Sequence, residues 1–256
     1  MDRRMCFLLL LLFFVGSAWG DLVLLPNPNT TSSALEIGTN KYLYVSLYDT
    51  ETSAKQDITY QVRTTVDDPQ IVAVNMPVLA PLSSGETVLH ISYEGIEPVL
   101  QLDIAITVTG TAWYESLVFR PRSSDGTGEL VAENQFQMLY GDDLSISIYG
   151  VLNTGKEVSM LRAVNLTWDD NGVLVLTSGL TSTSRTFQAQ AAGTVVFHAS
   201  LGGVLEVEPL TVTVFGIETF RFGPDLQALR EFDTVSTLYA IYGNGKEVAV
   251  NKVLYR

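Results

Sequence analysis

An internal repeat is the feature that most constrains the fold of this chain. The segment Gly155-Lys156-Glu157-Val158 recurs as Gly245-Lys246-Glu247-Val248, each time a few residues after a Tyr-Gly pair. A second echo relates Gly85 to Gly193 at an offset of 108 residues (193 − 85), and it extends at the same offset to Val88, His90, Ser92 and Gly95. Two echoes in different parts of the unit predict a tandem array of similar modules.

Alternating apolar residues predict that these modules are built from β-strands. In the segment 144–149, Leu144, Ile146 and Ile148 share one face of a period-2 pattern. Similar alternation occurs at 42–48, 88–93, 102–108, 195–201, 210–215 and 237–242. Turn-forming clusters such as Asp67-Asp68-Pro69 and Gly243-Asn244-Gly245 separate these runs. The pattern predicts an all-β fold of sandwich or barrel type, and Leu226–Phe232, the one helix candidate, is expected to be a loop or single turn.

The first 20 residues predict a signal peptide. Arg3 and Arg4 precede an apolar run, and Ala18-Trp19-Gly20 has the small residues of a cleavage site. The apolar run is shorter than the roughly 20 residues that a membrane-spanning helix needs, and no later segment approaches that length. An uncleaved signal anchor is the alternative. Cys6 is the one cysteine and lies inside the signal, so the mature chain must be stabilised without disulfides.

The repeats divide the rest of the chain into three expected units. An immunoglobulin-like β-sandwich spans 21–110, a second spans 111–216, and 217–256 begins a third. The junctions are short and contain no Gly/Ser linker, so neighbouring units are expected to stack semi-rigidly. Residues 217–256 are too few for a sandwich, so we expect a fragment of a longer protein, whose last 40 residues pack poorly or add a strand elsewhere.

Composition excludes several function classes. The chain has 28 Asp and Glu against 15 Lys and Arg, a formal net charge of −13. Such a surface repels nucleic acid and anionic lipid, so no nucleic-acid partner is expected. The mature chain has no thiol chemistry or Cys-ligated metal, and no cofactor motif occurs. Nucleophile-elbow, zinc-protease and phosphate-loop motifs are also missing from the sequence, so we expect a protein that is not an enzyme.

The second unit resembles the bacterial immunoglobulin-like domain of group 2, found in invasin- and intimin-type surface proteins. The residues that carry the resemblance are Leu144–Tyr149, Gly155–Val158, Leu166-Thr167-Trp168, Asp169–Gly172, Ala192–Ser200 and Thr211–Val214. The family's Trp falls on Trp168. In the first unit the same position is assigned to Val62 or Thr64. The resemblance implies seven-strand sandwiches that act as spacer, scaffold or recognition module, without catalysis.

The two histidines, His90 and His198, occupy equivalent positions in the repeat. One hypothesis is a repeated metal or pH-sensing site. The other, which we favour, is an outward-facing strand position, with Leu89 and Ile91, or Phe197 and Ala199, facing inward. Acidic doublets in turns are candidate calcium ligands, although Asp is also common in turns for its own hydrogen bonding; they are Asp67-Asp68, Asp142-Asp143 and Asp169-Asp170-Asn171.

Aromatic residues supply two candidate surfaces for sugar or protein ligands. These are Trp113-Tyr114 and the stripe of Tyr42, Tyr44 and Tyr48, for which packing or edge-strand roles are the alternative. Trp168 is expected in a core. Asn29 and Asn165 head Asn-x-Thr triplets and are candidate glycosylation sites, with Asn165 near a strand start and less accessible than Asn29.

Three functions remain open from the sequence. The first is an extracellular structural or adhesive protein, secreted or on the cell surface, with a protein or glycan ligand. The second is the N-terminal targeting appendage of a longer secreted enzyme that acts on polysaccharide or cell wall. The third is the lumenal part of a eukaryotic membrane glycoprotein of nuclear-pore type, in the endoplasmic reticulum or nuclear envelope, with a membrane anchor beyond Arg256.

Overall fold

The fold is known from a computed structural model that describes residues 22–28, 32–124, 126, 128–169, 171–178, 184–222 and 234–255. The predicted signal peptide, the predicted turn at Leu226–Phe232 and Asn29 lie outside the described residues. Every regular element in the described residues is a β-strand, which confirms the all-β prediction. In the same residues, no helix has the length and hydropathy required to cross a membrane.

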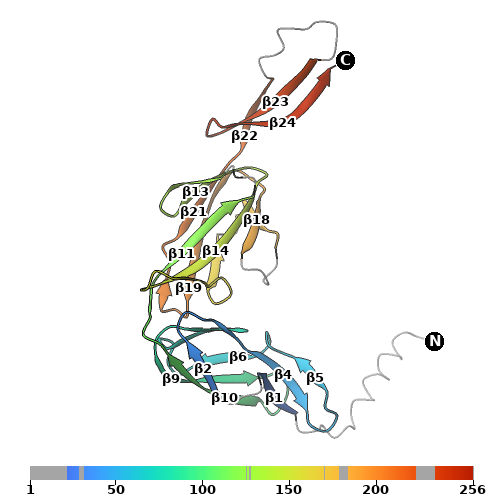
Figure 1. Cartoon of the computed structure of the whole chain (residues 1–256). Helices are drawn as coiled ribbons and strands as arrows, with labels where there is room; N and C mark the ends of the chain where they lie inside the picture. Colours follow the sequence, from blue (N-terminus) through green and yellow to red (C-terminus); the bar gives the residue numbers. More distant parts are fainter. Residues whose placement is uncertain are drawn as a thin grey trace, which may run out of the picture.

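The strands fall into three successive groups, which we call modules 1, 2 and 3. No strand pairing among the described residues joins one group to another. Figure 1 shows the modules following one another, with module 1 in blue to green, module 2 in green to orange and module 3 in red. The strands of module 1 run across the direction of those in module 2. The chain is therefore a tandem array of β-structured modules.

Module 1 contains ten strands in three sheets, ordered β1-β4-β5, β2-β10-β9-β6 and β3-β8-β7. Strands β2 and β10 run parallel, and the other pairs are antiparallel. The bounds are β1 Leu22–Asn27, β2 Ser32–Glu36, β3 Lys41–Tyr42, β4 Tyr44–Asp49, β5 Lys55–Asp57, β6 Arg63–Val66, β7 Val72–Asn75, β8 Val78–Pro81, β9 Gly85–Tyr93 and β10 Leu100–Thr109.

Module 2 is a sandwich of two sheets. One has the order β11-β14-β18-β17 with β15 beside β14, and the other has the order β12-β13-β21-β19-β16 with β20 beside β19. The bounds are β11 Tyr114–Ser123, β12 Glu129–Ala132, β13 Gln135–Leu139, β14 Asp143–Leu152, β15 Glu157–Ser159, β16 Asn165–Trp168, β17 Leu174–Leu176, β18 Arg185–Ala189, β19 Gly193–Leu201, β20 Leu205–Glu206 and β21 Leu210–Phe215.

Module 3 consists of one antiparallel sheet in the described residues, with β22 Ile217–Phe222, β23 Thr234–Tyr242 and β24 Glu247–Tyr255. These strands pair with one another and add no strand to the sheets of module 2. Poor packing was also expected for this segment. The end of β23 that faces module 2 is instead well packed, because Ala240 is fully buried and Tyr242 is nearly so.

Apolar alternation explains how module 2 closes its core. In β14 the residues Leu144, Ile146 and Ile148 are completely buried, and the residues between them are partly exposed. Phe187 of the same sheet meets Phe197 of the opposite sheet at a ring-centroid distance of 5.1 Å, in an edge-to-face arrangement. Trp168 packs edge-on to Phe187, also at 5.1 Å. Trp168 therefore lies against the core, as its place in the pattern predicted.

Two details of module 1 differ from the sequence prediction. Residues 42–48 do not form one strand, because the chain changes sheets at Leu43: β3 pairs with β8, whereas β4 pairs with β1 and β5. In addition, neither Val62 nor Thr64 takes the place of Trp168. Trp168 pairs with Phe197 and Val66 pairs with Leu89 at the same point of the ladder, so the equivalent residue is Val66. The short motif could not fix this register, since a shift of two residues keeps the same face.

Candidate functional site at the module junctions

The junction of modules 1 and 2 combines apolar packing with hydrogen bonds between the two modules. The turn after β2 lies against the β14–β15 hairpin. Gly38 has a φ of +86°, and a Cβ placed there would be 2.9 Å from Leu152 Cδ1 and 3.9 Å from Val158 Cγ2. Glycine is needed at this point both for its left-handed backbone and for the close approach of Leu152. The hairpin therefore fits directly onto the backbone of module 1.

The apolar core is continuous across this junction. Buried residues of both modules belong to a single cluster, which includes Ile37 of module 1 and Leu152 and Met160 of module 2. At a second point of contact, a Cβ on Gly202 would be 2.8 Å from the Cβ of Ala73. Burying apolar surface between the modules opposes their separation, at roughly 25 cal/mol for each Å² removed from water. The two modules therefore pack against each other through one continuous apolar core.

Polar contacts surround the apolar part of the junction. Asn40 Nδ2 donates to the Ser159 carbonyl at 2.9 Å. Asn75 Nδ2 donates to the Val164 carbonyl at 3.2 Å. The first bond leaves module 1 from the segment after β2 and the second from the last residue of β7, and together they reach both ends of the segment 159–164. Because they hold the junction at two separate points, they oppose rotation of one module relative to the other as well as separation of the modules.

Arg162 of module 2 covers an aromatic ring of module 1. Its Nη1 lies 3.4 Å from the Tyr42 hydroxyl, and its guanidinium carbon lies 5.6 Å from the ring centroid. This geometry is that of a cation–π contact. The predicted stripe of Tyr42, Tyr44 and Tyr48 is therefore divided, because Tyr42 lies on β3 at the junction and Tyr44 and Tyr48 lie on β4.

Tyr114 closes the base of the hairpin. Its side chain is 6% exposed, and a Cβ on Gly150 would come within 2.7 Å of its ring. Burial raises the pKa of Tyr114 to about 12. Its neighbour Trp113 is 54% exposed, so the predicted Trp113-Tyr114 surface consists of Trp113 alone.

Modules 2 and 3 meet through a smaller apolar cluster. Leu139, Ala240 and Tyr242 are buried together, with Phe215 and Val248 packed against them. The Gly243 N–H donates to the Gly216 carbonyl at 3.0 Å. The contact again joins the end of one module to the hairpin that carries the Gly-Lys-Glu-Val repeat in the next.

The repeated Gly-Lys-Glu-Val segment is the second half of these junction hairpins. Leu152 N–H donates to the Lys156 carbonyl at 2.9 Å, and Tyr242 N–H donates to the Lys246 carbonyl at 3.0 Å. Gly155 and Gly245 have the same φ of +78°. The repeat noticed in the sequence is therefore a repeat of the docking hairpin, which sequence reasoning alone did not recognise.

In both modules the glutamate of the repeated segment pairs with an arginine of β11 or β22, across the intervening strand β14 or β23. Glu157 accepts a hydrogen bond from Arg120 at 2.5 Å, and Glu247 pairs with Arg221. The second pair raises the pKa of Arg221 and lowers the pKa of Glu247 through their mutual hydrogen bond. Both pairs are substantially exposed, so solvent screening leaves each only a small contribution to stability. Their effect is to orient the hairpin.

The two histidines occupy outward strand positions, as favoured from the sequence, but their surroundings differ. His90 Nδ1 lies 2.8 Å from Asp103 Oδ1, and its Nε2 lies 3.0 Å from Asp67 Oδ1. These bonds, that to Asp103 first, raise the pKa of His90. His198 has no carboxylate partner among the described residues. His90 of β9 thus links β10 with Asp67, the residue that follows β6.

The acidic turns use their side chains for local hydrogen bonds. Asp68 Oδ1 accepts from the Gln70 N–H at 2.9 Å, and Asn171 Oδ1 accepts from the Val173 N–H at 3.1 Å. Asp142 Oδ2 accepts from the Leu139 N–H at 3.3 Å. In the part of the chain that the structure describes, no three His, Cys, Asp or Glu side chains converge so that they could hold a metal ion.

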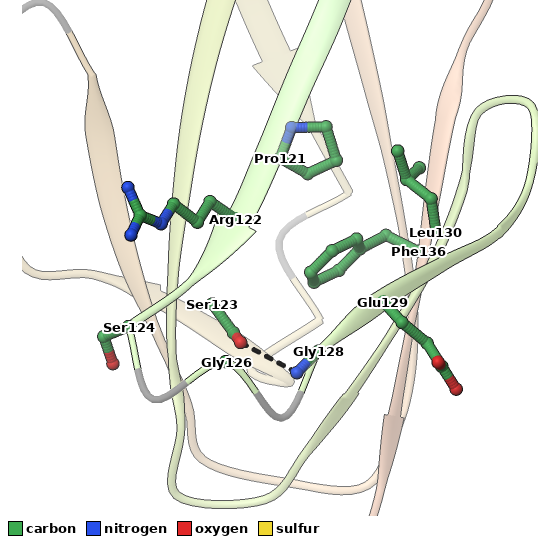
Figure 2. Close-up of a pocket in the computed structure, with 9 residues that line it drawn as sticks. All are labelled: Pro121, Arg122, Ser123, Ser124, Gly126, Gly128, Glu129, Leu130 and Phe136. Carbon is green, nitrogen blue, oxygen red and sulfur yellow. Dashed lines mark hydrogen bonds between the residues drawn. The ribbon is translucent and has the colours of Figure 1, made fainter.

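Several shallow hollows lie on the described surface of module 2. One contains Asn165 and His198, and two others adjoin β11. Figure 2 shows the first of the two that adjoin β11, where Ser123 Oγ accepts a 2.7 Å hydrogen bond from the Gly128 N–H and the Phe136 ring lies opposite. Arg122 points away from this hollow (Figure 2). It lines the second, a polar trough on the outer face of β11 and β14 whose walls include Arg120, Arg122, Ser145, Ser147, Tyr149 and Glu157.

The candidate glycosylation residue Asn165 begins β16, at the edge of its sheet. Asn165 and Thr167 are both exposed on the same side of this strand, and Leu166 between them is buried. The acceptor amide and the hydroxyl that the triplet requires are therefore presented together. The expectation of lower accessibility than Asn29 is not tested, since Asn29 lies outside the described residues.

Comparisons with known proteins give structural similarities only. No family model and no curated protein matches the sequence. The S-layer protein SbsC, domains 5-6, is 14% identical with a TM-score of 0.27, covering 76% of this chain and 98% of that one. Yersinia pseudotuberculosis InvD is 11% identical with a TM-score of 0.27, covering 89% and 72%. The fibronectin(III)-like modules of Clostridium thermocellum CbhA are 11% identical, with a TM-score of 0.23, and cover 76% and 94%. With scores this low, the evidence for the fold is the sheet topology described above.

Proposed function

We propose that this chain is a non-enzymatic extracellular protein whose stacked immunoglobulin-like modules act as a spacer or present a recognition surface. The finer assignment, to the bacterial immunoglobulin-like domains of group 2, rests on the sequence motifs given above. The predicted signal peptide and the cysteine-free mature chain support secretion or display at a cell surface. We propose that the module junctions provide the stiffness that the spacer role requires.

The observation that carries the proposal is the continuous core of modules 1 and 2. Interfaces between domains of one chain usually allow relative motion unless they are large and apolar. Here Leu152 is buried against Gly38, and hydrogen bonds from Asn40 and Asn75 flank the contact. A spacer needs this property, because a hinge between modules would lose the reach that stacking provides.

Small-angle X-ray scattering of the full chain tests the spacer role. A stiff array predicts one extended distance distribution that is the same at low and high salt, because the junction is mainly apolar. A broad distribution that needs an ensemble of bent forms to fit it would contradict the proposal.

The trough on β11 and β14 is the candidate recognition surface. Arg120 and Arg122 stand two residues apart on one strand face, beside Ser145, Ser147 and Tyr149. Among the described residues, no acidic group pairs with Arg122. Arg120 is paired with Glu157, so Arg122 is the guanidinium available to a ligand. A guanidinium next to hydroxyls and an aromatic ring suits a carboxylated or sulfated sugar. A glycan-binding screen with the wild type and Arg122→Gln tests this surface, and equal binding by both would contradict it.

One observation favours the lumenal glycoprotein as a second candidate function. The exposed pair Asn165 and Thr167 is suited to glycosylation in a eukaryotic secretory pathway. Detection of a single spanning helix downstream in the full reading frame would favour this alternative, and further repeats followed by a wall anchor would contradict it.

A further inference from the structure

The β14–β15 hairpin of module 2 and the β23–β24 hairpin of module 3 present apolar residues at the same positions. In module 2 these are Leu152 and Val158, and in module 3 they are Tyr242 and Val248. The equivalence is fixed by the hairpin closure, in which Leu152 and Tyr242 each donate to the lysine carbonyl of the repeat. Both hairpins contact the end of the preceding module where its parallel strand pair finishes, at Gly38 in one case and at Leu139 and Phe215 in the other.

The corresponding hairpin of module 1, β4–β5, can be aligned through one shared hydrogen bond. Ile58 N–H donates to the Val45 carbonyl at 2.9 Å, and Met160 N–H donates to the Ile148 carbonyl at 2.8 Å. Four residues after Val45 stands Asp49, where module 2 has Leu152. Two residues before Ile58 stands Gln56, where module 2 has Val158.

The module 1 hairpin is therefore polar at both docking positions. Asp49 Oδ1 accepts from the backbone N–H groups of Glu51 and Thr52 at 2.9 and 3.1 Å, which holds the carboxylate in the turn. Residues 50–57 are all exposed. Packing this end against an apolar module end would bury an ionised carboxylate away from water, which is costly without a paired charge.

We infer that the Gly-Lys-Glu-Val hairpin is a one-sided docking element for the end of a preceding β-sandwich module, and that the β4–β5 hairpin of module 1 is a polar cap that accepts no such partner. Terminal repeats of stacked arrays commonly have a polar outer face for this reason. The inference deepens the proposed spacer role and rests on it, since it specifies the direction in which modules stack.

The experiment transfers the cap into the junction. Leu152→Asp with Val158→Gln gives module 2 the residues of module 1. Spin labels at Glu86→Cys and Glu206→Cys, in a Cys6→Ser background, report the distance between modules 1 and 2 by electron double resonance. We expect the distance distribution to become about twofold broader or more, as for domains without an apolar interface.

The matched control is Thr154→Asp, which adds the same charge at the exposed tip of the same hairpin. It should leave the distribution as narrow as in the wild type. A narrow distribution in the double variant would overturn the docking role. If the double variant loses its near-ultraviolet circular dichroism, the milder variant Leu152→Ala replaces it. The distance distribution should again broaden, and a narrow distribution would again overturn the docking role.

Sedimentation velocity of the full chain tests the cap. The polar cap is supported if the wild type is a monomer, or if it forms an oligomer that Asp49→Arg does not change. It is overturned if the wild type forms an oligomer that Asp49→Arg dissociates. These outcomes differ from failure of the spacer role, in which the unaltered chain itself gives a broad distance distribution.

Discussion

Gly38 and Leu152, 114 residues apart in the chain (152 − 38), meet so closely that a Cβ on Gly38 would lie 2.9 Å from Leu152 Cδ1. This contact joins the turn after β2 in module 1 to the β14–β15 hairpin of module 2. No periodicity or motif of the sequence connects the two residues. Their meeting makes two sandwiches behave as one packed unit.

Gly38→Ala should lower the free energy of unfolding and loosen the junction. The φ of +86° costs an alanine about 1–2 kcal/mol, and its methyl group also crowds Leu152. Gly141→Ala is the matched control, since Gly141 has a φ of +90° with no atom within 4 Å of the added Cβ. Urea denaturation should show a backbone cost in both variants, and scattering should show a changed shape for Gly38→Ala alone. Equal shapes would argue against the close contact.

Phe187→Ala should destabilise module 2 by about 3–5 kcal/mol, because it empties a large volume in a fully buried site. The substitution also removes both edge-to-face contacts, with Trp168 and with Phe197. Denaturation followed by tryptophan fluorescence would measure the loss. Phe220→Ala, at a 55% exposed ring, is the control and should have little effect. A loss below 1 kcal/mol for Phe187→Ala would be inconsistent with the described core.

Tyr114 should make the protein sensitive to alkali. In the unfolded chain its hydroxyl ionises near the ordinary pKa of 10.0, whereas burial raises the pKa to about 12 in the folded protein. The folded state therefore binds more protons between these values, and the free energy of unfolding falls as pH rises from 10 to 12. Tyr114→Phe should reduce this fall, and Tyr60→Phe, at a 75% exposed residue, should not. The same slope in all three proteins would contradict the burial of Tyr114.

His90 should stabilise module 1 at low pH. Its pKa is raised in the folded state by Asp103 and Asp67, so its contribution is complete below the unfolded value of 6.5 and is lost as pH rises through the higher folded value. The difference in unfolding free energy between wild type and His90→Gln should follow that course. His198→Gln, on the equivalent strand position, serves as the control. A His90 difference that is constant from pH 5 to 9 would rule out the linkage.

Asn165 should carry glycan when the chain is secreted from a eukaryotic cell. Its amide and the Thr167 hydroxyl are exposed together on β16. Peptide mass spectrometry before and after glycosidase treatment should detect the modification, and Thr167→Ala should abolish it. Ser200→Ala, which alters the residue paired with Asn165 across the ladder, should leave it unchanged. Full occupancy despite Thr167→Ala would contradict the assignment.

Much of the fold followed from local pattern. Alternation in 144–149 placed Leu144, Ile146 and Ile148 in a core, and the offset between Gly85 and Gly193 matched β9 with β19. Both signals are local, because neighbouring strand residues point to opposite faces whatever the strand packs against. Outward positions for His90 and His198 followed from the same parity.

The local pattern did not determine which surfaces meet. The contrast between exposed Trp113 and buried Tyr114 arises from the junction. The tyrosine stripe is divided because β3 and β4 belong to different sheets. The equivalence of Val66 with Trp168 needed the ladder, because the pleat repeats every two residues.

The amino-acid sequence by itself determined that this protein is a row of similar β-structured modules, since repeat and alternation are properties of neighbouring residues. Tertiary structure alone decided that the Gly-Lys-Glu-Val repeat is a docking hairpin and that module 1 has a polar end. The physical reason is that docking depends on the side chains of two separate modules and on the water removed between them, which neither segment encodes alone.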